Sequence, residues 1–251
     1  MIHRRLAKGR QVSDANTITL ARRGEVAWLV IDRTDKANAL TAAMMAEMSA
    51  HVAACATDAS VKALVLTGAG QRVFSGGVDV RTPTDLPAAD ARRLRSERFF
   101  ELLIAVAGFA KPVITGMNGI ASGGAAMIAL LGDRVIAAEH AALALPEIDL
   151  GGPTLPGLAV LAYLAGPGIA SDLVQSARRM PAAEALARGL VSEVATPDAL
   201  DARVEQAALL LGSKPASAFA LNKQWLRRPL LESLHAAEAE HRRLRASGAI
   251  H

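Results

Sequence analysis

The stretch Pro112–Gly132 constrains the fold most, because no charged residue interrupts it. Its first part, Pro112–Met117, is apolar and contains β-branched residues, which predicts a buried strand. Turn signals follow at Asn118-Gly119 and Ala121–Gly124, and the apolar run from Ala125 predicts a buried helix. The stretch is about as long as a membrane span, but the Asn, the Ser and the four glycines in its middle favour a strand, a turn and a helix.

This order of elements points free backbone N–H groups at a ligand. The first turn of a helix has unpaired N–H groups and the positive end of the helix dipole, and glycine lets another group approach the backbone closely. Such a turn can bind an anion or stabilise an oxyanion that forms during a reaction. The alternative is that the glycines serve only close packing of the helix against the strand.

The glycine-rich loop Gly68–Asp79 follows another predicted strand. It resembles a phosphate-binding loop only loosely, because it lacks the Gly-Lys-Ser/Thr ending of a nucleotide P-loop. Its segment Gly76–Val78 offers a second backbone N–H to the same site as the turn at Ala121–Gly124. The sequence therefore predicts that two glycine loops converge.

Composition bounds the class of protein. With 51% hydrophobic residues in 251, the chain has enough apolar side chains for one large domain with a sizeable core. The single cysteine, Cys55, excludes an internal disulfide and is typical of a reducing compartment. Residues 1–16 are basic and polar without the apolar segment of a secretory signal, so we expect a cytoplasmic protein. The net charge of +4 is scattered and aromatic residues are few, so we expect neither a nucleic-acid nor a membrane partner.

The remaining pattern predicts an α/β fold with a helical C-terminal part. Strands are expected at 17–20, 26–32, 61–67, 134–138, 142–145 and 191–195. Helices are expected at 41–56, with Thr41 as the N-cap, and at 89–107, 157–166, 168–177 and 182–188. From Pro197 onward the chain is predicted to be helical, with breaks near 213–215 and at Arg228-Pro229. We therefore divide the chain into a flexible leader (1–16), a core (17–195) and a helical C-terminal region (196–251).

Five groups of residues occur in an order that carries a family resemblance. They are Asn38-Ala39-Leu40; Val65–Gly68 with Phe74–Asp79; Lys111–Ile114 with Asn118-Gly119 and Ser122–Gly124; Pro146-Glu147-Ile148; and Ala183–Ala185 with Gly189–Val191. Together they resemble the enoyl-CoA hydratase/isomerase family, the crotonase superfamily, over residues 17–250. The resemblance implies a crotonase-like spiral of ββα units with a helical C-terminal region that contributes to contacts in a trimer or a hexamer.

The resemblance also implies an enzyme of fatty acid metabolism, an isomerase or a lyase, whose substrate is an acyl-CoA thioester. Coenzyme A is then part of the substrate, and no separate cofactor or metal is expected. The family's shared chemistry is a thioester enolate held by two backbone N–H groups, which correspond here to Val78 and Gly124. These donors lie in the two loops already selected from the glycine pattern, and such a preorganised pair stabilises a developing anion.

The catalytic carboxylates depart from the hydratase pattern. In hydratases of the family a Glu follows the second oxyanion glycine by three positions, but here that position is Met127, whose thioether cannot transfer a proton. The family's other Glu corresponds to Glu147. One base can take a proton from C2 and return it at C4 without activating water. The sequence therefore favours a 3-enoyl-CoA to 2-enoyl-CoA isomerase over a 2-enoyl-CoA hydratase.

Alternatives stay open at this stage. Asp149 is a candidate second carboxylate, because residues two apart share a face in an extended segment; His140 is expected at the surface. Another crotonase reaction, such as thioester hydrolysis, C–C cleavage or decarboxylation, would use the same oxyanion hole. A non-catalytic acyl-CoA-binding role would be favoured if Glu147 pointed away from that hole.

The resemblance also indicates where coenzyme A lies. It nominates residues of the Asn-Ala-Leu loop and of the loop after Gly77 as substrate-binding residues, and it places Gly124 and Met127 at the acyl end. The residues of the two loops are Lys36, Ala37, Ala39, Val78, Asp79, Val80 and Arg81. Lys36 and Arg81 are candidates for phosphate contacts. Asn38 is expected to hold its own turn through its side chain.

Overall fold

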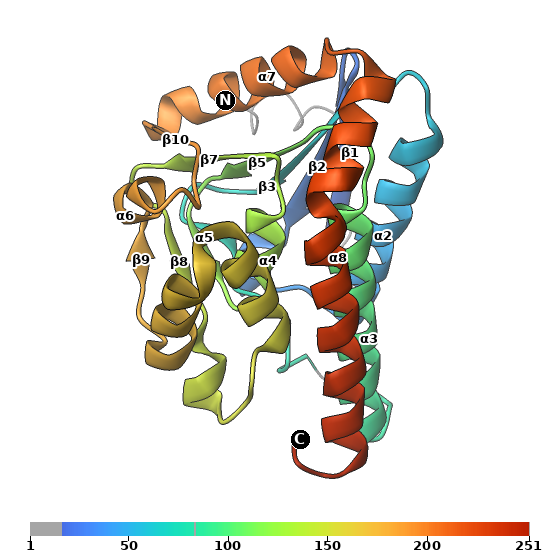
Figure 1. Ribbon diagram of the computed structural model, residues 1–251, viewed down its shortest axis with the longest axis vertical. Coiled ribbons are helices and arrows are strands. Elements are labelled where there is room, and N and C mark those ends of the chain that lie inside the picture. The colour runs from blue at the N-terminus through green and yellow to red at the C-terminus, as the bar shows by residue number, and fades with distance from the viewer. Residues whose placement is uncertain (1–16, 83, 251) are drawn as a thin grey trace.

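The computed structural model in Figure 1 describes residues 17–82 and 84–250. The predicted flexible leader, residues 1–16, lies outside the described residues. A six-stranded sheet forms the centre, in the order β1-β2-β3-β5-β7-β10. These strands are β1 (Thr17–Arg23), β2 (Val26–Asp32), β3 (Ala63–Gly68), β5 (Val113–Met117), β7 (Arg134–Ala138) and β10 (Glu193–Ala195). Only β1 and β2 pair antiparallel; the other neighbours in this sheet are parallel. The parallel strands are buried, which explains their continuous apolar runs.

A second, smaller sheet has the order β4-β6-β8-β9. Its strands are β4 (Val73–Ser75), β6 (Ile120–Ser122), β8 (Ala142–Ala144) and β9 (Met180–Pro181). Consecutive strands alternate between the sheets: β3 is followed by β4, β5 by β6, and β7 by β8. Each pair then leads into a helix: α3 (Ala88–Ala107), α4 (Gly124–Leu130) or, through the 3₁₀ helix η2 (Pro146–Leu150), α5 (Leu155–Ser176). This repeat is the spiral of ββα units that the resemblance implied.

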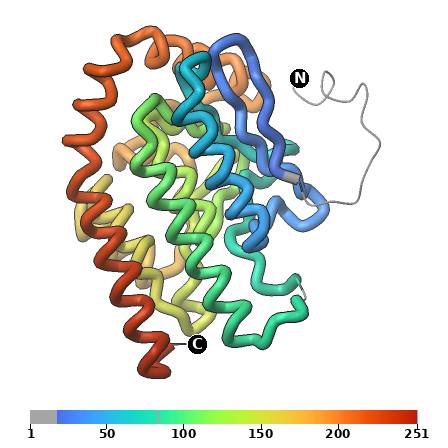
Figure 2. Tube along the Cα trace, turned by 90° about the vertical axis from the view of Figure 1, so that its right-hand side faces the viewer, coloured from blue at the N-terminus to red at the C-terminus, as the bar shows by residue number. Residues whose placement is uncertain are grey.

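Three helices run side by side along the molecule (Figure 2): α2 (Ala42–Thr57), α3 and α8 (Ala216–Ala246). The first begins as predicted, since the Thr41 hydroxyl accepts a hydrogen bond from the Met44 N–H at 3.2 Å. The helix α7 (Pro197–Gly212) packs on β3, β5 and β7, with Val204 3.0 Å from where a β-carbon on Gly116 would lie. The short elements η1 (Thr34–Lys36) and α6 (Ala182–Ala187) complete the described chain. The division of the chain at residue 195 stays a prediction.

One expectation about the helices was wrong. α8 does not break at Arg228-Pro229 but continues through Pro229. Side chains on both sides of the proline, Arg227 before it and Leu230 after it, are buried on the same face and hold the two halves in line. The two helices expected at 157–166 and 168–177 are both present as the halves of α5, divided by a kink at Gly166, whose φ of 81° is not helical, before Pro167.

By length and composition α5 would be able to cross a membrane, and it is the one helix of the described residues that meets this test. Core helices of water-soluble proteins meet the same test. Here the kink interrupts the helix, and its buried face packs against α4, η2 and α8.

An ion network anchors α8 to the ends of the central strands. Asp133, which directly precedes β7, accepts hydrogen bonds from Lys223 Nζ at 2.6 Å and from the Val113 N–H at 2.8 Å. Its other carboxylate oxygen lies 3.4 Å from Nη2 of Arg227, which also donates to the Leu131 carbonyl. Both cationic side chains are only 5% exposed. The network therefore depends on the Asp133 charge.

We predict that Asp133→Ala lowers the free energy of unfolding by about 3–5 kcal/mol, because it leaves two buried cations without their anion. The matched control is Glu232→Ala on the same helix, which removes an exposed ion pair with Arg228 and should cost less than about 1 kcal/mol. Urea unfolding of both variants at one protein concentration measures the difference. A loss for Asp133→Ala no larger than that of the control would contradict the anchoring role.

Candidate active site

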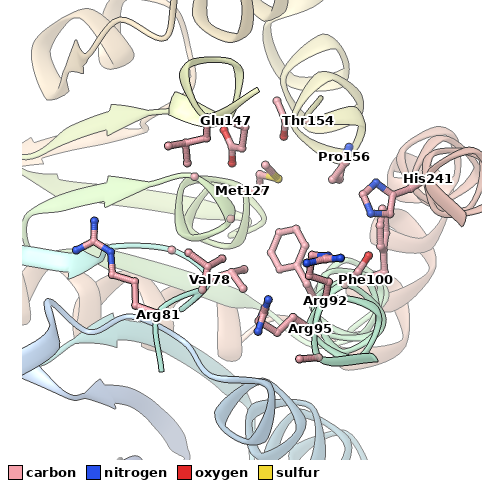
Figure 3. Close-up of a pocket in the computed structure, with 18 of the residues that line it drawn as sticks. Val78, Arg81, Arg92, Arg95, Phe100, Met127, Glu147, Thr154, Pro156 and His241 are labelled. Carbon is pink, nitrogen blue, oxygen red and sulfur yellow. The ribbon is translucent and has the colours of Figure 1, made fainter. Parts of the chain in front are cut away.

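Three parallel strands of the small sheet deliver the three predicted catalytic residues to one place. Val78 follows β4, Gly124 follows β6 and Glu147 follows β8. Because the carboxyl ends of neighbouring parallel strands lie at the same edge of a sheet, these residues converge. All three line a single cavity of about 820 Å³ (Figure 3).

The two glycine loops are in direct contact. A β-carbon on Gly77 (φ 96°) would lie 2.6 Å from the Ser122 carbonyl oxygen, and one on Gly124 would lie 3.2 Å from Cγ2 of Val78. The segment around Val78 is held by two backbone bonds of 2.8 Å, from the Leu40 N–H to the Gly77 carbonyl and from the Asp79 N–H to the Leu40 carbonyl.

This pattern leaves the Val78 N–H free, and the Gly124 N–H is free because Gly124 is the first residue of α4. Neither group donates to an acceptor in the described part of the chain. Two loops in contact thus each have one free backbone N–H beside the cavity, and their role as an oxyanion hole stays a prediction.

Glu147 is the only carboxylate among the described residues that line this cavity. Its Oε1 lies 2.9 Å from where a β-carbon on Gly123 would be, so the carboxylate faces the start of α4. Its Oε2 is buried and has no hydrogen-bond partner in residues 17–82 and 84–250. Burial raises the pKa of Glu147 above its ordinary value, although a hydrogen bond to its own backbone N–H opposes the rise. A carboxylate in this state is a stronger base than a solvated one.

Met127 provides an apolar wall beside this carboxylate (Figure 3). It lies one turn of α4 after Gly124 and is 2% exposed. The expectation that Asp149 shares a face with Glu147 was wrong, because the segment is a 3₁₀ helix with three residues per turn rather than an extended strand. Asp149 is exposed and does not line the cavity. His140 is at the surface as expected, with Nε2 2.6 Å from the Gln71 carbonyl oxygen.

The residues nominated for binding coenzyme A separate into two groups. Val80 and Arg81 line the cavity together with Val78, whereas Lys36, Ala37 and Ala39 do not. Lys36 and Ala37 are exposed in and after η1. The Ala37 carbonyl accepts the Gly76 N–H at 2.8 Å, so this turn supports the first glycine loop from outside.

Asp79 has a structural position rather than one on the cavity wall. Its carboxylate forms an ion pair with Arg33 and accepts hydrogen bonds from the Thr82 hydroxyl and from two backbone N–H groups. Burial opposes the charged form, but the hydrogen bonds from Thr82 and Arg33 outweigh it and lower the pKa of Asp79 well below its usual value. The carboxylate therefore fixes the loop that follows Val78.

Asn38 has the supporting role that its sequence position predicted. Its Oδ1 accepts the Arg33 N–H, and its Nδ2 donates to the carbonyls of Ala69, Val73 and Phe74. The residue is 1% exposed and has φ 55°, so its side chain ties the Asn-Ala-Leu turn to β4.

Part of the cavity wall was not anticipated. α3 contributes Arg92, Arg95 and Phe100, and the last turns of α8 contribute His241 and Arg245. The sequence showed the arginines only as part of a charged helix face. Thr154, at the start of α5, was also missed; it is 4% exposed and turns toward Glu147 (Figure 3). Within the described residues no group of three or more His, Cys, Asp or Glu side chains is arranged to hold a metal ion.

The fold is that of a crotonase-type enzyme, and comparison with known proteins agrees. The model of the enoyl-CoA hydratase/isomerase family matches residues 21–247, and the chain belongs to this family. It is 35% identical to a carnitinyl-CoA dehydratase of Salmonella arizonae over 83% of this chain and 80% of the relative. It is 33% identical to a short-chain-enoyl-CoA hydratase of Clostridium acetobutylicum over 86% and 82% of the two chains. The crystal structure of an enoyl-CoA hydratase from Bacillus anthracis superposes with a TM-score of 0.80 at 28% identity, covering 94% of this chain and 95% of the other.

We predict that Glu147→Gln makes the folded protein more stable than the wild type, and increasingly so as the pH rises. Since the folded-state pKa is raised, ionising Glu147 costs stability as the pH rises through that pKa. Below the unfolded pKa both forms are neutral, so the pH-dependent part of the difference vanishes at acid pH.

Thermal unfolding midpoints between pH 4 and 8 measure this difference. The control is Glu184→Gln, because hydrogen bonds from Arg178 lower the pKa of Glu184 and the variant should lose stability relative to the wild type as the pH rises. If the difference between Glu147→Gln and wild type does not change with pH, Glu147 is not a desolvated acid.

Proposed function

We propose that this protein is a 3-enoyl-CoA to 2-enoyl-CoA isomerase. The observation that carries the proposal is the single carboxylate, Glu147, among the described residues of the cavity, with Met127 where a hydratase of the family has its second acid. A desolvated carboxylate without competing hydrogen bonds at Oε2 suits a base that takes and returns one proton. The proposal requires no resident metal or cofactor.

The reaction proceeds through a dienolate. The thioester oxygen accepts hydrogen bonds from the N–H groups of Val78 and Gly124, which lowers the energy of the negative charge that forms there. Glu147 takes a proton from C2, and the electron pair of that C–H bond becomes part of the dienolate. The protonated Glu147 then returns the proton to C4, and the double bond moves from C3–C4 to C2–C3. Met127 keeps water away from the reacting carbons.

Hydration of a 2-enoyl-CoA is the second candidate. It is favoured by the names of the relatives, which are hydratases and a dehydratase, and by one feature of the cavity. The Thr154 hydroxyl lies on the wall near Glu147 and makes no hydrogen bond within the described residues. In this alternative Glu147 and Thr154 hold the water molecule, and Thr154→Val abolishes hydration.

We predict that the wild type isomerises 3-hexenoyl-CoA faster than it hydrates 2-hexenoyl-CoA. Glu147→Gln should lower kcat/KM for isomerisation by about 10²–10⁴-fold, because it removes the only base, with little change in the affinity for hexanoyl-CoA. Met127→Glu should create measurable hydration, whereas the control Met127→Leu, which keeps the wall apolar, should not. Liquid chromatography with mass spectrometry in H₂O separates the products, since hydration adds 18 mass units whereas isomerisation leaves the mass unchanged and alters only the retention time.

Two results would overturn the proposal. Wild-type hydration at about 10 s⁻¹ or faster, a rate usual for enzymes, would assign the protein to the hydratases. Full binding of acyl-CoA without turnover of either substrate would assign it to a non-catalytic role, which the orientation of Glu147 toward Gly123 does not support.

We also propose that the protein assembles as a trimer or a hexamer through its helical C-terminal region. Three large apolar side chains of α8 support this: Leu221 is 66% exposed, Trp225 72% and Leu226 63%. Light scattering should give three or six times the mass of one chain, and Trp225→Glu should shift the population toward smaller species. A wild-type monomer at micromolar concentration would contradict the assembly.

A further inference from the structure

One end of the cavity is lined by four basic side chains that approach from two helices. Arg92 and Arg95 come from α3, and His241 and Arg245 come from the last turns of α8. We call these four residues the cationic wall. Figure 3 shows Arg92, Arg95 and His241 on the same side of the cavity, around the ring of Phe100. The Phe100 and His241 rings are in contact, with centroids 5.7 Å apart.

The cationic wall lacks an anion. Neither Arg92 nor Arg95 forms an ion pair or a side-chain hydrogen bond within residues 17–82 and 84–250, and Arg245 contacts only another basic side chain, His241, at 2.9 Å. The Nδ1 of His241 and the Nε of Arg245 are buried without a partner. In contrast, the neighbouring Arg93 and Arg98 of α3 form ion pairs with acids of their own helix.

The electrostatics of the wall agree with its geometry. Burial, followed by the nearby Arg92 charge, lowers the pKa of Arg245, and burial together with Arg245 lowers the pKa of His241. Glu97 is the acid that acts on Arg245, but it is half-buried on α3 and lies 3.5 Å from Arg93. The repelling charges beside the cavity are those of Arg92, Arg95 and Arg245, since the His241 Nε2 can accept the Arg245 N–H only when the ring is neutral, and these charges are stabilised when an anion enters.

The wall also has a defined position relative to the reaction. Glu147, Met127 and Val78 lie at the centre of the cavity, and Arg81 lies on the far side of Val78 from Arg95 (Figure 3). A thioester at the centre has two directions in which to extend, one toward Arg81 and one toward the cationic wall. The family resemblance predicts coenzyme A on the Arg81 side, and in that orientation the acyl chain points toward the wall, with Met127 and Phe99 also lining the cavity.

We propose that the cationic wall binds a carboxylate at the far end of the acyl chain, so that the preferred substrates are CoA thioesters of dicarboxylic acids. The planar guanidinium groups of Arg92 and Arg95 suit a carboxylate, which accepts two parallel N–H bonds from one arginine. The inference rests on the proposed function only in placing an acyl-CoA in this cavity. It does not depend on which reaction follows.

A phosphate of coenzyme A is the other anion that would suit the wall. It would require the thioester to enter in the opposite direction, with the acyl chain toward Arg81. The two sources differ in one respect that can be measured: a wall that binds phosphate acts on every CoA compound, whereas a wall that binds a terminal carboxylate acts only on dicarboxylic chains.

Equilibrium binding tests the inference without relying on turnover. Adipyl-CoA and hexanoyl-CoA have the same chain length and differ in the terminal carboxylate, and calorimetry should find adipyl-CoA bound about tenfold to a hundredfold more tightly by the wild type. The double variant Arg92→Gln/Arg95→Gln should remove this preference while leaving the affinities for hexanoyl-CoA and free CoA within about twofold. Arg93→Gln is the matched control, because this arginine is on the same helix but does not line the cavity, and it should keep the preference.

Three other results of the binding measurements would contradict the inference or the function on which it rests. If hexanoyl-CoA binds as tightly as adipyl-CoA to the wild type, the wall does not select a terminal carboxylate. If the double variant weakens free CoA, hexanoyl-CoA and adipyl-CoA equally, the wall binds the phosphates of coenzyme A instead. If no acyl-CoA binds to the folded wild type, the proposed function itself is wrong, which is a different result from a lost preference.

Discussion

The site depends on how closely the backbones of the two glycine loops approach each other. A β-carbon on Gly77 would lie 2.6 Å from the Ser122 carbonyl oxygen, which belongs to the backbone and cannot move aside easily, and one on Gly123 would lie 2.9 Å from Oε1 of Glu147 and would displace this carboxylate. One strand junction repeats this constraint, since a β-carbon on Gly119 would lie 2.3 Å from the Arg72 carbonyl. The absence of side chains at these few positions lets β4, β6 and β8 bring Val78, Gly124 and Glu147 to one cavity.

The electrostatic character of the cavity follows from the same packing. Each ββα unit buries its strands on both faces, so the small sheet ends inside the protein rather than at the surface, and the carboxylate that follows β8 is desolvated with it. Desolvation of Glu147 lowers the stability of the folded protein, because its unpartnered Oε2 would be better hydrated in the unfolded chain. The same desolvation lowers the stability of the fold and raises the basicity of Glu147, a combination that is common at functional sites.

Local sequence signals predicted the elements that depend on local chemistry. The Thr41 cap, the buried run of β5 and the turn held by Asn38 were all expected from neighbouring residues. The conformation of Pro146–Leu150 was not, because an apolar segment with two acids fits an extended strand as well as a 3₁₀ helix. The cationic wall had no sequence signal, since Arg95 and His241 are brought together only by the contact of α3 with α8.

The half of α8 that is anchored to the central strands is separate from the end of the helix that lines the cavity. Asp133 fixes the first half of the helix to the ends of the central strands, whereas its last turns extend past the catalytic strands to the rim of the cavity. The last turns of α8, which we propose contact the tail of a bound molecule, are therefore far in sequence from Val78, Gly124 and Glu147. Substitutions in those last turns can therefore change which tail is preferred without altering β4, β6 and β8. New substrate preferences can then evolve with little loss of catalytic rate.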